Sequence, residues 1–300
     1  MQRETAVHHQ QASSVLVIGG DSTLGGLLVD RLSRKKSLVV STTRHRITMR
    51  PNQVFLDLST ASLDASNLPE AIGWVVICAA MTNQQACAEN PEESRRVNVT
   101  NTIELCKWAA QQNAKTILLS TNLIFDGLEP SAGPNSPIAP QSLYAQQKAE
   151  VEEVVLRQPG NTVCRLSKVL DQKTPLISKW IAKLRSGAPV KAFSDYKFAP
   201  VHSSIVIEVL TKIIEQKRPG IYQVSATETI SYAEFARMIA RALGLSPELV
   251  EGSLAPPHVF PESGMHRPIF MDMDTKAIQK KLGISPPTIE ATIDLLLAQA

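Results

Sequence analysis

The sequence predicts an α/β protein in which a doubly wound parallel sheet is followed by a smaller C-terminal α/β domain. In the first half of its 300 residues, short apolar runs alternate with longer stretches of helical spacing. Several runs are apolar almost throughout, as strands buried on both faces are. This alternation is typical of parallel strands joined by helical crossovers. The runs expected to be strands are 15–18, 38–42, 54–56, 74–78, 116–119 and 162–165.

Helices are expected between these strands and again in the second half. Apolar residues recur at the spacing of a buried helix face in 23–33, 92–112 and 144–157. The second half predicts helices at 177–186, 204–216, 231–243, 274–282 and 288–298, with short strands at 190–192 and 220–224. We therefore expect a disordered tail at 1–13, a sheet domain at 14–165, and a mainly separate domain at 166–300 with some segments returning to the sheet domain.

The composition argues against several classes of protein. The net charge of +3 is small and no basic stripe is visible, so we expect no nucleic-acid partner. No apolar run reaches the roughly 18 residues of a membrane span, and the polar start lacks the apolar core of a signal peptide. We therefore expect a cytoplasmic protein without a membrane partner. The cysteines are irregularly spaced, which predicts neither a disulfide framework nor a metal site: Cys78, Cys87, Cys106 and Cys164.

A glycine-rich turn joins the first expected strand to the first expected helix. Glycine lets the backbone bend sharply and lets a pyrophosphate approach bare N–H groups, while the helix N-terminus attracts the same anion. A glycine motif alone is ambiguous, since many strand-to-helix turns need glycine, but this one has the strand–turn–helix context of a dinucleotide site. The sheet domain is therefore expected to be Rossmann-like, with cofactor contacts from Gly19, Ser22, Thr23, Leu24 and Gly25.

The end of the second expected strand indicates which dinucleotide is bound. NAD-binding domains usually place an acid there for the ribose 2′-hydroxyl, whereas an arginine suits the 2′-phosphate of NADP. The stretch 42–46 reads Thr-Thr-Arg-His-Arg and holds no acid. Either this is an ordinary solvated basic loop or, given the turn upstream, it binds NADP(H) with Arg44 as the phosphate partner.

A tyrosine and a lysine stand four residues apart at Tyr144 and Lys148, so they share one face of the expected helix. A free tyrosine is a poor acid–base catalyst at neutral pH, but a neighbouring ammonium group and a cationic nicotinamide favour its phenolate. The strand that ends near Ser120 and Thr121 supplies hydroxyl groups one loop upstream. Together these residues predict a site for hydride-transfer chemistry.

Longer segments resemble the extended short-chain dehydrogenase/reductase family, and within it the dTDP-4-dehydrorhamnose reductases. The most specific is Ser-Thr-Asn-Leu-Ile-Phe-Asp-Gly at 120–127, followed by Tyr-x-x-x-Lys. The resemblance covers nearly the whole chain after the first dozen residues. Other segments that carry it are 76–80, 89–92, 96–102 (with Asn98 matching the family's helix asparagine), 220–225, 232–236 and 282–287.

The resemblance implies an NADPH-dependent reductase of a keto group on a nucleotide-linked sugar. Thr121 would hydrogen-bond the substrate carbonyl, Tyr144 would protonate its oxygen, and Lys148 would hold the nicotinamide ribose. Residues 14–165 would bind NADP and residues 166–300 mainly the substrate. Further cofactor contacts are implied for Asp57, Leu58, Ala79 and Ala80, and substrate contacts for Thr82, Asn122, Phe125 and Arg267. A homodimer is expected only by analogy with the fold.

The chain departs from the family pattern mainly on the substrate side. Lys168 stands where the family usually has tryptophan, and apolar residues replace small or polar family residues at Phe198, Val201, Phe270 and Met271. Each buried hydrogen bond that the loss of a polar group removes costs about 1–3 kcal/mol. The departures are Ser22, Asn101, Asn122, Lys168, Phe198, Val201, Phe270 and Met271. They leave open a second hypothesis, an NADP-binding regulatory subunit similar to that of methionine adenosyltransferase. A third, an epimerase or dehydratase of the same fold, is disfavoured because no acid follows Thr121.

Overall fold

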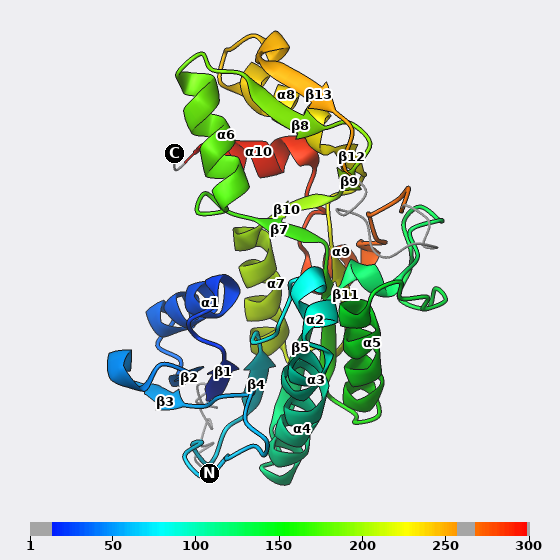
Figure 1. The fold of residues 1–300 in the computed structure, drawn as a ribbon. Helices are drawn as coiled ribbons and strands as arrows, with labels where there is room; N and C mark the ends of the chain where they lie inside the picture. The colour runs from blue at the N-terminus through cyan, green and yellow to red at the C-terminus, as the bar shows by residue number, and fades with distance from the viewer. Residues whose placement is uncertain (1–13, 257–267, 299–300) are drawn as a thin grey trace, which may run out of the picture.

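The computed structural model describes residues 14–256 and 268–298, so the tail expected at 1–13 lies outside the described residues. Within them, seven strands form one sheet in which every pairing is parallel (Figure 1). The order β11-β6-β5-β4-β1-β2-β3 starts near the centre and winds outward both ways, which confirms the predicted α/β class. The strands are β1 (Val15–Ile18), β2 (Val39–Thr43), β3 (Gln53–Phe55), β4 (Trp74–Ile77), β5 (Lys115–Thr121), β6 (Thr162–Leu166) and β11 (Gly220–Val224).

Helices cover both faces of this sheet. On one face lie α1 (Thr23–Arg34) and α7 (Ser203–Gln216), which contact each other. On the other lie α4 (Asn101–Gln111) and α5 (Leu143–Leu156). Helix α1 buries Gly25, Leu28 and Leu32, a spacing of three and four residues that places all of them on one helix face. Two-sided cover explains why the strands are apolar almost throughout.

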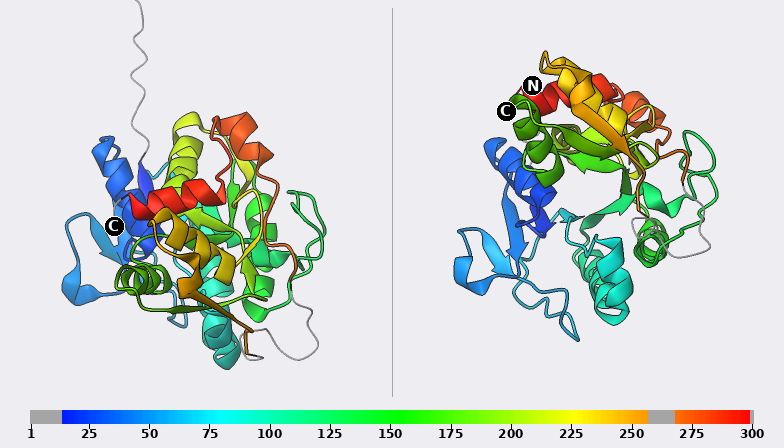
Figure 2. Two further views of the ribbon diagram at one scale, coloured as in Figure 1. Left: turned by 90° about the horizontal axis from the view of Figure 1, so that it is seen from above. Right: turned by 45° about the horizontal axis from the view of Figure 1, so that its top comes forward.

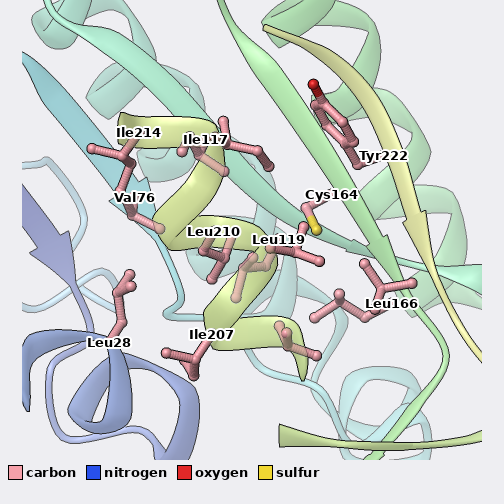
Figure 3. Packing of buried hydrophobic residues seen from close by; sticks show 14 of the residues in the cluster. Leu28, Val76, Ile117, Leu119, Cys164, Leu166, Ile207, Leu210, Ile214 and Tyr222 are labelled. Carbon is pink, nitrogen blue, oxygen red and sulfur yellow. The ribbon is translucent and has the colours of Figure 1, made fainter. Parts of the chain in front are cut away.

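The core beneath α7 joins distant parts of the sequence. Figure 3 shows Ile207 and Leu210 of α7 packed among side chains of the sheet, including Val76 and Ile117, with Leu28 of α1 beside them. All five side chains are buried. The last sheet strand, β11, is supplied by residues beyond 219, so the second half of the chain completes the sheet.

A smaller α/β unit lies at one end of the sheet, where Figure 2 shows the C-terminal orange and red segments gathered. Its separate core packs Trp180 and Phe235 with Ile293, one residue from each of its main helices. Those helices are α6 (Pro175–Arg185), α8 (Tyr232–Ala242) and α10 (Ile289–Leu297), while α9 (Lys276–Leu282) packs on β11. Its short strands pair as β7 (Lys168–Leu170) with β10 (Pro200–His202), β8 (Val190–Phe193) with β13 (Val250–Ser253), and β9 (Lys197–Phe198) with β12 (Ile230–Ser231).

The helix expected at 92–112 is interrupted. The structure has α3 (Pro91–Arg95), a π-helical turn at Arg96–Thr100, and then α4; the shorter α2 (Gln84–Glu89) precedes them. A π turn inserts extra backbone into a helix and is frequent at functional sites. None of the helices within the described ranges is both long and apolar enough to cross a membrane.

Candidate functional site

A cleft of about 370 Å³ opens at the carboxyl ends of β4, β5 and β6, the edge where open α/β sheets bind ligands. It brings together residues that lie far apart in the sequence, from both the sheet and the smaller unit. Among the predicted site residues, those lining it are Leu24, Ala79, Ala80, Thr82, Thr121, Asn122, Tyr144 and Lys148. The smaller unit contributes Lys168, Tyr196, Lys197, Phe198, Tyr232 and Met271.

The glycine-rich turn between β1 and α1 has no room for a side chain at Gly19, Gly20 or Gly25. Gly19 has φ +87°, and a Cβ there would lie 2.8 Å from the Cβ of Ala79. A Cβ on Gly25 would lie 2.1 Å from the carbonyl oxygen of Gly19. Because these positions carry no side chains, no Cβ atoms cover the backbone N–H groups at the N-terminus of α1. This is the cradle that a pyrophosphate requires.

Ser22, which replaces the family's middle glycine, is the N-cap of α1. Its hydroxyl accepts the Gly25 N–H at 3.1 Å and donates to the carbonyl of Gly19 at 2.7 Å. Because capping satisfies only one N–H group, those of Thr23 and Leu24 are left by helix geometry for an anion. The residues present thus fit a dinucleotide, and the serine keeps the turn closed without glycine.

An acid does lie at the end of β2, although it comes from the turn. The Asp21 carboxylate accepts hydrogen bonds from the hydroxyl of Thr43, the last residue of β2, and from the Gln53 amide at 3.3 Å. Arg44, the predicted phosphate partner, is the exposed next residue. Inspection of residues 42–46 missed this acid, since it lies some twenty residues earlier in the chain.

Hydrogen bonds from α4 fix the loop that follows β3. Asn101, where the family usually has glycine, donates from its amide to the carbonyl oxygens of Leu58 and Thr60 at 2.8 and 2.9 Å. Asp57 accepts hydrogen bonds from the N–H and hydroxyl of Ser59. The Leu58 side chain is buried in the core. The loop is therefore rigidly placed, but neither Asp57 nor Leu58 lines the cleft as described.

Helix α5 presents Tyr144 and Lys148 to the cleft from one face. Its N-terminus is fixed by Ser142, whose hydroxyl accepts the Ala145 N–H at 3.3 Å. Burial raises the pKa of the Tyr144 phenol above its ordinary value. Burial likewise lowers the pKa of the Lys148 ammonium to about 8, against the opposing attraction of Glu152. The phenol is thus protonated at neutral pH, and the expected lowering of its pKa by the neighbouring ammonium is not what dominates here.

Two hydroxyl groups at the end of β5 complete this wall of the cleft. Thr121 is buried, and its hydroxyl accepts the Leu123 N–H at 3.2 Å. The Ser120 hydroxyl oxygen is buried without a hydrogen-bond partner among the described residues. A buried unpaired hydroxyl is costly unless a ligand or water satisfies it. The Ser120 hydroxyl can therefore bind a polar group of a ligand beside Thr121.

A buried polar network joins α5 to the π-helical turn. The Asn98 amide donates to the Gln147 side chain at 2.8 Å and to the Met81 carbonyl at 2.9 Å, while its oxygen accepts the Met81 N–H at 2.8 Å. Gln147 in turn donates to the Ser94 hydroxyl at 2.9 Å. Gln147 lies on α5 directly before Lys148, so this network holds α5 against α3 and the π-helical turn. Nothing in the helical spacing pointed to Gln147.

The residues predicted to contact the substrate do not all line the cleft. Thr82 and Asn122 line the cleft, and the Asn122 amide donates to the Met271 carbonyl at 2.9 Å. Phe125 instead lines an adjoining cavity of about 130 Å³, which shares Asn122 and Met271 with the cleft. Arg267 lies outside the described residues.

An aromatic stack occupies the smaller unit's side of the cleft. The ring of Tyr232 stacks on Phe198 with centroids 4.1 Å apart and on Tyr196 at 5.5 Å. Exposed Lys168 and Lys197 border the same wall. Phe198 thus fills, with apolar surface, a position where the family usually has a small residue. Motif comparison located Phe198 as a departure but not the stack it builds.

A parallel sheet, a glycine-rich turn between β1 and α1, and a Tyr-x-x-x-Lys helix that lines the cleft together define the extended short-chain dehydrogenase/reductase class. The chain belongs to the RmlD substrate binding domain family, whose model matches residues 13–300. This result agrees with the resemblance that the motifs carried.

Individual relatives share about a quarter of their residues with this chain, and they are named for different functions. The probable low-salt glycan biosynthesis reductase Agl14 of Haloferax volcanii is 26% identical over 76% of this chain and 77% of its own length. The dTDP-4-dehydrorhamnose reductase of Mycolicibacterium smegmatis is 24% identical, covering 80% of this chain and 72% of that protein. Methionine adenosyltransferase 2 subunit beta of Rattus norvegicus is 25% identical over 71% of this chain, which spans 66% of that protein.

Solved structures confirm the fold. A dTDP-4-dehydrorhamnose reductase from Clostridium acetobutylicum superposes with a TM-score of 0.79 at 19% identity, covering 95% of this chain and 99% of the other. The Bacillus anthracis reductase, determined in complex with NADP, also gives 0.79, at 17% identity, with 96% and 99% covered.

Proposed function

We propose that the chain is an NADPH-dependent reductase of a keto group on a nucleotide-linked sugar. The observation that carries this proposal is the cleft that Thr121, Tyr144 and Lys148 line together with Leu24, which lies in the first turn of α1 just after the glycine-rich turn. The relatives named as reductases support the class of reaction. The neighbour determined with NADP supports the cofactor.

The chain's own residues would hold the substrate and move one proton. NADPH, when bound, supplies the hydride. Thr121 donates a hydrogen bond that orients the substrate carbonyl, and Tyr144 transfers its phenolic proton to the carbonyl oxygen, which becomes the product hydroxyl. The protonated phenol that burial favours is the form this direction needs. The Lys148 ammonium stabilises the phenolate left behind until solvent returns the proton.

Tyr144→Phe should abolish turnover without disturbing the fold. The substitution removes the proton donor and leaves the ring packing, so kcat should fall by about 10²–10⁴-fold. The measurement is NADPH oxidation with a panel of nucleotide-linked 4-keto sugars.

Tyr222→Phe is the matched control for that experiment. The Tyr222 hydroxyl donates to the Arg218 carbonyl away from the cleft, so its removal should leave turnover unchanged. Full activity in Tyr144→Phe on a turned-over substrate would refute the proposed role of this tyrosine.

A second function, an NADP-binding regulatory subunit, is favoured by one feature of the cleft. The stacked Phe198 and the apolar Phe270 and Met271 stand where the reductases carry polar or small residues. Several relatives are methionine adenosyltransferase 2 beta subunits. Tight NADPH binding without turnover across the panel, together with co-elution with a methionine adenosyltransferase from the same source, would establish this function instead.

A further inference from the structure

The end of β2 holds two groups of opposite charge. Asp21 reaches it from the glycine-rich turn through its hydrogen bond with the Thr43 hydroxyl, and Arg44 follows Thr43 directly in the chain. Gln53 on the neighbouring strand donates the second hydrogen bond to the carboxylate. Two separate donors fix the carboxylate at this place.

This is the place where Rossmann domains distinguish the two dinucleotides. A carboxylate at the end of the second strand accepts a hydrogen bond from the ribose 2′-hydroxyl, whereas it repels a 2′-phosphate. A carboxylate can accept about four hydrogen bonds, so Asp21 keeps capacity for a ligand hydroxyl after those from Thr43 and Gln53. Arg44 favours the phosphate, and the two residues therefore act in opposite directions.

We propose that Asp21 is a cofactor-specificity residue, which binds the ribose 2′-hydroxyl of NADH and opposes the 2′-phosphate of NADPH. This inference rests on the dinucleotide site of the proposed function, but not on the identity of the sugar substrate.

The test is direct binding of NADH and NADPH, without substrate, to the wild type and to Asp21→Asn. The asparagine keeps an oxygen that accepts from Thr43 but loses the charge. The ratio of the dissociation constants should shift toward NADPH by about tenfold or more. Arg44→Gln should shift the same ratio toward NADH. Asp30→Asn, on the exposed face of α1 two turns further on, removes an equal charge and should leave the ratio unchanged.

The outcomes separate this inference from the function on which it rests. If both dinucleotides bind but Asp21→Asn changes neither constant, or changes both equally, Asp21 does not set specificity. A wild type that prefers NADPH by several orders of magnitude would also overturn the inference. If the wild type binds neither dinucleotide, the cofactor part of the proposed function fails, and this inference with it.

Discussion

Lys148 carries its charge in a place that disfavours charge. Its side chain is only 3% exposed, and burial lowers its pKa to about 8. Nearby Glu152 offsets part of that penalty but is itself paired with Arg165. A buried ammonium group retained at such a cost is typical of a functional site.

Lys148→Met should make the protein more stable at neutral pH while abolishing turnover. The methionine removes a desolvated charge, so the free energy of unfolding at pH 7 should rise by about 1–3 kcal/mol. Urea unfolding measures it. Lys107→Met, on an exposed lysine of α4, is the control and should change stability by less than about 0.5 kcal/mol.

The same pair of proteins predicts a pH dependence. A lysine with a lowered pKa binds fewer protons in the folded than in the unfolded chain between about pH 8 and its ordinary value of 10.5. The penalty is therefore complete below pH 8 and fades as the pH rises toward 10.5. The stability difference between Lys148→Met and the wild type should shrink across this window, and a constant difference from pH 7 to 10 would contradict the buried charge.

Single residues also show where sequence reasoning stops. The three residues that the motifs singled out, Thr121, Tyr144 and Lys148, all line the cleft, while their catalytic roles stay a prediction. Asp21 and Gln147 were missed because their partners lie far away in the sequence, at Thr43 and Asn98. Hydrogen bonds between distant segments leave no local spacing to recognise.

One face of helix α5 both lines the cleft and forms a buried ion pair. Tyr144 and Lys148 face the cleft, and Glu152, one turn further on, binds Arg165 of β6 at 2.8 Å inside the protein. Arg165 also donates to the carbonyl of Pro134, at 3.0 Å. This pair therefore fixes the cleft-lining helix to the sheet and to the proline-rich loop at once.

Arg165→Met should be strongly destabilising. It leaves the Glu152 carboxylate buried without its partner, which should cost about 3–5 kcal/mol in chemical unfolding. Arg157→Met is the matched control, because Arg157 pairs with Glu153 at the exposed end of the same helix. That change should cost less than about 1 kcal/mol. Equal losses in the two variants would show that burial of the pair does not matter.

Among the elements, those with strong periodicity were predicted best. The sheet strands and most helices lie within a few residues of their expected bounds. The interruption at Arg96–Thr100 was not predicted, because polar bonds of Asn98 rather than apolar spacing accompany it. The short strands β7, β9, β10, β12 and β13 were not predicted, because isolated runs of two to four residues carry little pattern.

At the scale of the whole molecule, the two halves of the chain share one core. Helix α7 packs on the sheet, and β11 and α9 return to it from the second half. We propose that residues 14–165, with these returning segments, form the dinucleotide-binding part, and that the rest of 166–300 mainly binds substrate. The smaller unit has its own core, but Val201 of β10 belongs to the core beneath α7, and β10 also contacts α10 of the smaller unit, so we predict that the parts unfold together.

Leu210→Ala tests that cooperativity. The side chain is buried between α7 and the sheet, so its loss should cost about 2–5 kcal/mol. Fluorescence of Trp74 in the sheet and of Trp180 in the smaller unit, each in a variant that retains only that tryptophan, reports both parts. Both transitions should shift equally, whereas a shift confined to Trp74 would show independent units.

The position of β11 also has a consequence for synthesis on the ribosome. When β6 has emerged, its outer edge has no partner strand, and the sheet face that α7 will cover is still bare. At ordinary elongation rates, the roughly 60 further residues take about 3–12 s to appear. During that interval the nascent chain exposes an unpaired edge and an apolar face, the two features that chaperones recognise and that drive aggregation. Slow translation between β6 and β11 would therefore lower the yield of folded protein, although it changes no residue of the final structure.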